Sequence, residues 1–297
     1  YEKIIRQFPK YPKLEEVFYY LGRNGLRTGI SLGNKDLSTK SCTYLDRFTK
    51  KFPNSKYRSK ALFSLGEYYY NDNKLADALN YYKELTEKHP DAPMENYSRY
   101  KLGWVYYNYQ QYEQVIQLFK QVMAKENVQG RKNSQLYGQA FNDYIHAVSE
   151  GGMGWEDAKT FLIAEVGNTK AYVQLHRIAD LMATKDYGDD AITLYEHFIS
   201  LAPTSEKAIG YWDKILTTSK FNLSQEDSQN FVNKMNQFFA PKGAFLVANS
   251  QAPIVERVND LQIKWSLFLA ERHLEEALYH RRTEDDDGES NVMANYN

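Results

Sequence analysis

A spacing of small and aromatic residues recurs along the chain and limits the folds that it can adopt. A small residue is followed twelve positions later by a small or medium apolar residue, and four positions after that by an aromatic one. The three runs are Gly66, Ala78 and Tyr82; Gly103, Val115 and Phe119; and Ala179, Ala191 and Tyr195. Small residues let antiparallel helices approach closely, so we expect Gly66 to face Ala78 across a hairpin. The recurrence predicts an all-α fold, a solenoid of antiparallel helix hairpins.

Proline marks the ends of the predicted second helices. Pro90 and Pro203 each follow the aromatic residue of their unit by eight positions. Proline has no N–H donor and its ring clashes with the preceding turn, so it does not continue a helix. Tyr1 precedes Pro9 by the same eight positions. We therefore expect the chain to begin inside the second helix of a repeat, with more of the solenoid N-terminal to it.

The register divides the chain into a solenoid over residues 1–283 and a short tail. We predict clear units at about 59–92, 96–129 and 172–205, degenerate units at about 14–53, 133–168 and 206–240, and a capping helix at about 254–281. The remaining residues, 284–297, carry acids and few apolar side chains. Such a composition cannot bury enough surface to offset chain entropy, so we predict an acidic disordered tail.

Composition narrows the classes of function. The chain has 297 residues, with 37 Lys and Arg against 38 Asp and Glu, and the two signs are interspersed. A nucleic-acid partner is not expected, because proteins that bind nucleic acids concentrate their Lys and Arg residues in one stripe of the surface. No apolar run approaches the roughly 20 residues that span a membrane. The single cysteine, Cys42, excludes an internal disulfide and is expected to be a buried small hydrophobe.

Sequence motifs for catalysis are absent. The glycine run at 151–154 lacks the Lys-Ser/Thr that completes a phosphate-binding loop, and neither a Gly-x-Ser-x-Gly nor a His-Glu-x-x-His string occurs. His273 and His280 share a helix face near Glu276, but solvated helix polarity explains them better than a metal pair. We predict no catalytic residue, no cofactor and no metal site.

The complete register resembles the tetratricopeptide repeat, in which Leu-Gly, Tyr, Ala, an aromatic residue and Pro recur. Two strings, residues 52–57 (FPNSKY) and 81–85 (YYKEL), resemble bacterial cell-envelope tetratricopeptide proteins. These include the outer-membrane lipoprotein of the beta-barrel assembly machinery and the Tol-Pal-associated cell-division coordinator. The resemblance covers roughly residues 1–205. It implies a right-handed superhelix and a periplasmic or envelope-associated scaffold that docks proteins, while a cytoplasmic location stays open.

One helix face is the predicted partner-binding site. Spacings of three, four and three residues place an aromatic stripe on the first helix of the unit around Gly103, and the preceding unit has aromatic residues at equivalent sites. The predicted groove residues are Tyr97, Tyr100, Trp104 and Tyr107, with Phe63 and Tyr70. Exposed aromatic residues suit the gripping of a peptide or helix. The alternative is that the stripe packs on the preceding first helix through Phe63 and Tyr70.

Two functions fit this sequence. The first is a non-enzymatic scaffold that binds a protein or peptide segment in its concave groove, in a bacterial envelope complex. The second is a helical accessory domain of a larger envelope enzyme or of a sugar- or lipid-binding system. A clamp for carboxyl-terminal carboxylates is disfavoured, because the resemblance requires Lys and Asn where Phe63, Glu67, Tyr100 and Trp104 stand. The oligomeric state stays open.

Overall fold

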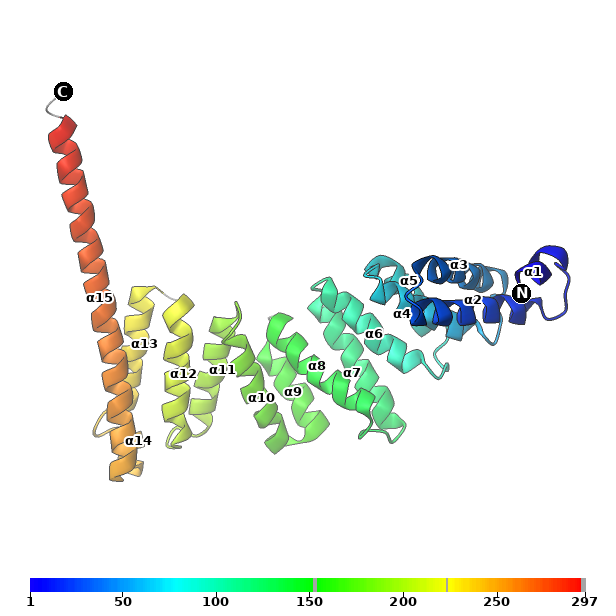
Figure 1. Cartoon of the computed structure of the whole chain (residues 1–297). Helices are drawn as coiled ribbons and strands as arrows, with labels where there is room; N and C mark the ends of the chain where they lie inside the picture. The colour runs from blue at the N-terminus through cyan, green and yellow to red at the C-terminus, as the bar shows by residue number, and fades with distance from the viewer. Residues whose placement is uncertain (152–153, 223, 295–297) are drawn as a thin grey trace. The chain divides into compact units, whose positions relative to one another are not determined.

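A computed structural model of the chain describes residues 1–151, 154–222 and 224–294, and within these ranges every regular element is an α-helix. The chain forms two compact units, unit 1 (Tyr1–Gly151) and unit 2 (Gly152–Asn297). Figure 1 colours unit 1 from blue to green and unit 2 from green to red. The predicted all-α architecture of antiparallel helix hairpins is confirmed.

Unit 1 consists of successive helix hairpins (Figure 1). Its helices are α1 (Glu2–Gln7), α2 (Leu14–Ser31), α3 (Lys35–Lys51), α4 (Arg58–Asn71), α5 (Leu75–Lys88), α6 (Glu95–Asn108), α7 (Tyr112–Val128) and α8 (Gln135–Gly151). The hairpins are α2 with α3, α4 with α5, and α6 with α7, and α8 packs against α7. The first helices α2 and α4 also touch, as do α6 and α8.

Unit 2 continues with helices that pack mainly on their neighbours in sequence. They are α9 (Trp155–Val166), α10 (Asn168–Met182), α11 (Gly188–Leu201), α12 (Lys207–Asn222), α13 (Gln225–Phe238), α14 (Ala244–Ala248) and α15 (Ala252–Ala294). The last helix, α15, packs on both α12 and α13. The predicted degenerate unit at 133–168 is divided, because α8 belongs to unit 1 and α9 to unit 2.

The turns inside the three hairpins of unit 1 share one geometry. Gly33, Asn73 and Gln110 each adopt a positive φ, between 56° and 62°, directly before the second helix. In the middle turn the Lys74 N–H donates to the Tyr69 carbonyl oxygen at 2.8 Å, and both other turns have the equivalent bond. This is the Schellman arrangement, which satisfies carbonyls left open at a helix end. The repetition of the turn supports the repeat register.

Close packing inside each hairpin depends on glycine, although the contacting residue differs from the prediction. A Cβ built on Gly66 would lie 2.6 Å from the Tyr82 ring, and one on Gly103 would lie 2.6 Å from the Phe119 ring. The expectation that Gly66 faces Ala78 is therefore wrong, since the nearest atoms belong to Tyr82. In the first two runs the ring of the aromatic residue lies directly against the glycine.

Glycine-to-alanine substitutions test this packing. Gly66→Ala is expected to lower the free energy of unfolding by about 1–2 kcal/mol, because overpacking a fully buried ring costs more than the helix gains from alanine. Gly138→Ala, in α8, is the matched control, because no atom lies within 4 Å of its added Cβ. That control is expected to gain up to about 1 kcal/mol. Urea denaturation measures both, and equal effects would contradict the packing.

The predicted proline boundaries agree with the structure. Helix α5 ends at Lys88, two residues before Pro90, and α11 ends at Leu201, two residues before Pro203. Both helices end because proline would remove a backbone donor from the next turn. Proline therefore marks the ends of α5 and α11, whereas α7 ends at Val128 without one.

The C-terminal end differs from the sequence prediction. Helix α15 runs through residues 254–281, as predicted, and continues to Ala294. The stretch 284–294 is therefore helical where a disordered tail was predicted, and 295–297 lie outside the described residues. Each residue added to an existing helix gains a hydrogen bond without a new nucleus, so acids can extend it. None of the described helices is both long enough and apolar enough to cross a membrane.

Candidate partner-binding site

The predicted aromatic stripe lies on α6 and packs against both neighbouring first helices. Tyr97 is 36% exposed and meets the edge of the Phe63 ring, on α4, at a centroid distance of 5.9 Å. Tyr100 is only 8% exposed and packs on Phe119 at 5.6 Å. Trp104 is partly buried, with its ring centroid 5.1 Å from that of Tyr107. Exposure therefore differs from residue to residue along the stripe, with Tyr97 the most exposed and Tyr100 the most buried.

Two hydroxyl groups of the stripe attach α6 to α8. Tyr100 donates a hydrogen bond to Asp143 Oδ2 at 2.7 Å, and Tyr107 donates to Glu150. Burial raises the pKa of both tyrosines above its usual range, and the adjoining carboxylates raise it further. Burial also raises the pKa of Asp143, although its hydrogen bond from Tyr100 opposes that shift. These polar contacts fix the spacing between the two first helices.

The predicted stripe is thus partly a packing surface. The expectation that Tyr100 is exposed is wrong, because α7 and α8 cover it, and the packing alternative holds for Tyr97 with Phe63. Tyr70 is half-buried, with the Lys101 ammonium 4.8 Å from its ring centroid. A binding role for the partly exposed rings stays a prediction.

A cavity of about 400 Å³ opens between the first helices α2 and α4. We call it the α2–α4 cavity. It is lined by Tyr19, Tyr20, Arg23, Tyr57, Lys60, Phe63, Ser64 and Met94. Phe63 is the one predicted groove residue among them. Aromatic side chains therefore make up half of the lining residues, and Arg23 and Lys60 supply its charge.

Three tyrosines form the wall of the α2–α4 cavity. Tyr19 stacks on Tyr57 with a centroid distance of 4.6 Å and an interplanar angle of 14°. Tyr20 lies 5.2 Å from Tyr19 and 5.8 Å from Tyr57. A hydrogen bond with the Tyr57 hydroxyl raises the pKa of Tyr20, and burial raises that of Tyr19. The rings hold one another in place, which produces a preformed surface with few free rotations.

Two cations stand at this wall without acidic partners. Arg23 and Lys60 are both exposed, and neither forms an ion pair with any residue that the structure describes. No acidic residue lines the cavity. An anionic group bound here would gain charge-assisted hydrogen bonds from both side chains. The cavity therefore favours a ligand that combines apolar or aromatic surface with a carboxylate.

The sequence contained a signal for this cavity that the predicted stripe missed. Groove positions lie three residues before and one residue after the glycine of a unit. They are Phe63 and Glu67 around Gly66, and Tyr100 and Trp104 around Gly103. The same register applied to Gly22 gives Tyr19 and Arg23. Gly22 takes part in an equivalent close contact, with a built Cβ 2.7 Å from Leu45. The repeat pattern is degenerate over residues 14–53, so the predicted groove does not extend to this unit.

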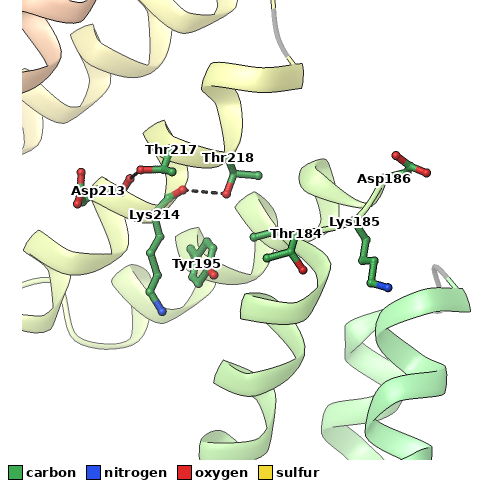
Figure 2. A pocket seen from close by; sticks show the side chains of 9 residues that line it. Thr184, Lys185, Asp186, Tyr195, Asp213, Lys214, Thr217 and Thr218 are labelled. Carbon is green, nitrogen blue, oxygen red and sulfur yellow. Dashed lines mark hydrogen bonds between the residues drawn. The ribbon is translucent and has the colours of Figure 1, made fainter.

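Unit 2 has a larger pocket, of about 560 Å³, where α11, α12 and the turn after α10 meet (Figure 2). Its charges are largely compensated inside the unit. Lys214 Nζ lies 2.5 Å from Asp180 Oδ1, which also accepts a 2.6 Å hydrogen bond from Tyr195. Asp213 pairs with Lys264 at 2.6 Å. The Thr217 and Thr218 hydroxyls donate to backbone carbonyls, as the dashed lines show. This pocket offers a ligand less unpaired charge than the α2–α4 cavity.

Comparison with known families gives one match. A model of the tetratricopeptide repeat matches residues 24–55 and 60–92, which contain the C-terminal part of α2, all of α3, most of α4 and all of α5. This match supports the predicted resemblance in the part of unit 1 that contains Lys60, and Arg23 lies one residue before the first matched segment. Its first segment falls in the hairpin that was classed as degenerate. Repeats of this kind use extended concave surfaces to bind other proteins.

Solved structures with similar helical repeats are distant in sequence. Two structures of kinesin light chain TPR-like repeats from Podosopora anserina are 12% and 11% identical to this chain, with TM-scores of 0.39 and 0.38. The alignments cover 78% and 79% of this chain, and 97% and 99% of the two matched chains. BtubC (BKLC) from P. vanneervenii is 9% identical, with a TM-score of 0.33, 82% of this chain covered and 92% of its own. No curated protein matches the chain.

Proposed function

We propose that the chain is a non-enzymatic scaffold that binds an acidic segment of a partner protein in the α2–α4 cavity. The observation that carries this proposal is the pair of unpaired cations, Arg23 and Lys60, beside a preformed aromatic wall. The cavity lies between two first helices, and Lys60, Phe63 and Ser64 of its wall fall inside the segments matched by the repeat model. A scaffold role also agrees with the general use of such repeats.

The aromatic and the cationic residues of the cavity contribute differently to binding. The tyrosine wall and Phe63 provide apolar area, which contributes about 25 cal/mol for each Å² removed from water. Arg23 and Lys60 select the sign of the ligand's charge and orient it. Each exposed ion pair contributes only about 0.2–1 kcal/mol, so affinity depends on the rings and specificity on the cations. A short peptide with one aromatic or aliphatic anchor beside an acid has this chemistry.

We further propose that this scaffold acts in a bacterial cell envelope. Support comes from the strings at 52–57 and 81–85, which resemble envelope tetratricopeptide proteins. The first string forms the turn from α3 into α4 and places Tyr57 at the cavity. Fractionation of cells that produce the native protein tests the location. Recovery in the cytosolic fraction alone would contradict it.

Peptide selection tests the binding proposal without a known partner. A randomised peptide library displayed on phage is expected to yield sequences rich in Asp and Glu beside an apolar anchor. The double variant Arg23→Glu/Lys60→Glu should bind the selected peptides about 30-fold more weakly, because two attractions become repulsions worth about 2 kcal/mol together. Fluorescence anisotropy with labelled peptides measures the affinities. Higher salt should weaken wild-type binding as charges are screened.

A matched control separates local contacts from overall charge. Arg47→Glu/Lys83→Glu makes the same change in net charge on the exposed surface of the second helices α3 and α5. It is expected to leave the affinity within about twofold of wild type. Equal losses in both double variants, or selection of basic peptides, would overturn the proposed site.

A further inference from the structure

The last helix has a buried face and an opposite, exposed face. The buried face packs on α12 and α13 through Val258, Leu261, Trp265 and Leu269, all at most 6% exposed. Trp265 also donates from Nε1 to Asp213 Oδ1 at 2.9 Å. Figure 1 shows α15 running beside α13 and continuing past its end. This contact fixes which side of α15 faces away from unit 2.

Apolar residues follow one line on the exposed face. Ile263, Leu267 and Leu274 are 58%, 59% and 61% exposed, and Ala270 and Ala277 are also exposed. We call these five residues the α15 seam. Their spacings of four, three, four and three residues give the 3.5-residue period of a coiled coil. At 100° per residue the seam lies opposite the buried face, and its five side chains are exposed among the residues of unit 2 that the structure describes.

Charge changes sign along the α15 seam. Glu256 and Asp260 occupy the same helix face before the apolar run, and Arg281 occupies it after the run. All three side chains are exposed, and none forms an ion pair with a described residue. Between residues 256 and 281 the exposed face therefore passes from acidic residues through an apolar centre to the basic Arg281, beyond which Glu284 and Asp285 follow in the sequence.

We propose that the α15 seam pairs with the α15 seam of a second copy of this chain, with the two helices antiparallel. In this arrangement Ile263 meets Leu274 of the second copy and Leu267 meets Ala270 of the second copy, in each direction. Glu256 then lies opposite Arg281 of the second copy at both ends. A parallel pair would instead place Glu256 against Glu256 and Arg281 against Arg281. The polarity of the seam thus fits a twofold-symmetric, antiparallel dimer.

The surface is suited to a second copy on two further grounds. Coiled-coil partners must share a period, and the helix itself supplies a partner with the same 3.5-residue spacing. Three large apolar side chains more than half exposed in one line form an unusual surface for a monomer. Pairing two such helices desolvates both at once, and the paired charges at the ends set the register.

Molar mass in solution tests the dimer. Light scattering on the full chain at tens of micromolar is expected to give twice the monomer mass of 34.7 kDa. Leu267→Glu/Leu274→Glu should return it to the monomer mass, because four buried acids would meet in the seam. The control Leu32→Glu/Val128→Glu changes exposed apolar residues of unit 1, 72% and 89% exposed, and should stay dimeric. Circular dichroism confirms that each variant is folded.

A charge-exchange series tests the antiparallel register. Glu256→Arg and Arg281→Glu should each weaken the dimer, because each places like charges opposite one another twice. The combined Glu256→Arg/Arg281→Glu variant restores opposite charges at both ends and should recover wild-type dimerisation. A wild-type chain that remains monomeric at these concentrations, or a dimer insensitive to the Leu267 and Leu274 substitutions, would overturn the proposal. Binding of a different protein to this seam by a monomeric chain would also overturn it.

Discussion

Glu126→Gln is expected to lower the free energy of unfolding by about 3 kcal/mol at neutral pH. The Glu126 side chain is 3% exposed and accepts hydrogen bonds at 2.8 Å from Asn96 Nδ2, Arg131 Nη2 and Ser134 Oγ. A glutamine amide keeps one acceptor oxygen, but it turns an NH2 group toward at least one of these donors and leaves Arg131 without its carboxylate. The network joins α6, α7 and the turn before α8, so its loss destabilises unit 1. Urea denaturation measures the change.

The same substitution has a defined pH dependence. Burial alone would raise the pKa of Glu126, but hydrogen bonds from Arg131, Ser134 and Asn96 outweigh it and hold the pKa below its usual range. A carboxyl with a depressed folded-state pKa contributes stability above its unfolded pKa of about 4.3 and loses it as the pH falls through the folded value. The difference between wild type and variant should therefore shrink below about pH 4.

The control for this series is Glu113→Gln, also on α7. Glu113 is exposed, so its substitution should change the free energy of unfolding by no more than about 0.5 kcal/mol. Equal effects at positions 113 and 126, or a penalty at position 126 that does not change with pH, would contradict the buried network.

Cys42 is expected to react with iodoacetamide roughly a thousandfold more slowly in the folded chain than in urea at pH 8. It is 2% exposed, and burial raises the pKa of its thiol to about 12 from a usual 9.0. The thiolate is the reactive form, and three pKa units reduce its fraction about a thousandfold. Because Cys42 is the single cysteine, mass spectrometry follows the reaction without a background. A folded-state rate within tenfold of the unfolded rate would contradict its buried position between α2 and α3.

The repeat register predicted the hairpins of unit 1 because spacing reports which residues share a helix face. The register assigns Gly66, Tyr82 and Pro90 fixed positions within their repeat unit. In the structure Gly66 lies against Tyr82, and α5 ends just before Pro90. Spacing does not report how far a large side chain reaches. The Tyr82 ring therefore took the place next to Gly66 that the prediction gave to Ala78.

The candidate site was predicted less well, because exposure depends on neighbours that are distant in sequence. The stripe from Tyr97 to Tyr107 shares a face, as its spacing required. Tyr100 is nevertheless covered, because its ring packs on Phe119 and its hydroxyl donates a hydrogen bond to Asp143, 43 residues later. The α2–α4 cavity was accessible from the sequence only by extending the register to Gly22. Whether Arg23 lacks an acidic partner could be read only from the folded structure.

The C-terminal helix shows a third limit of sequence patterns. The sequence predicts a capping helix at about 254–281, and the structure buries one face of it, from Val258 to Leu269. The exposed seam was not separated from that face, because both have helical spacing and only α12 and α13 decide which one is covered. The continuation to Ala294 depends on helix propagation from an existing end, which composition alone does not report.

Cross-linking of a selected acidic peptide tests the central claim most directly. A photoreactive residue replaces either Ser64, which lines the α2–α4 cavity, or Gln117, which lies on the exposed surface of α7. The account predicts that the peptide is captured at position 64 and not at position 117, and that Arg23→Glu/Lys60→Glu abolishes the capture. Capture at position 117, or none at position 64 while the peptide remains bound, would show that the α2–α4 cavity is not the binding site.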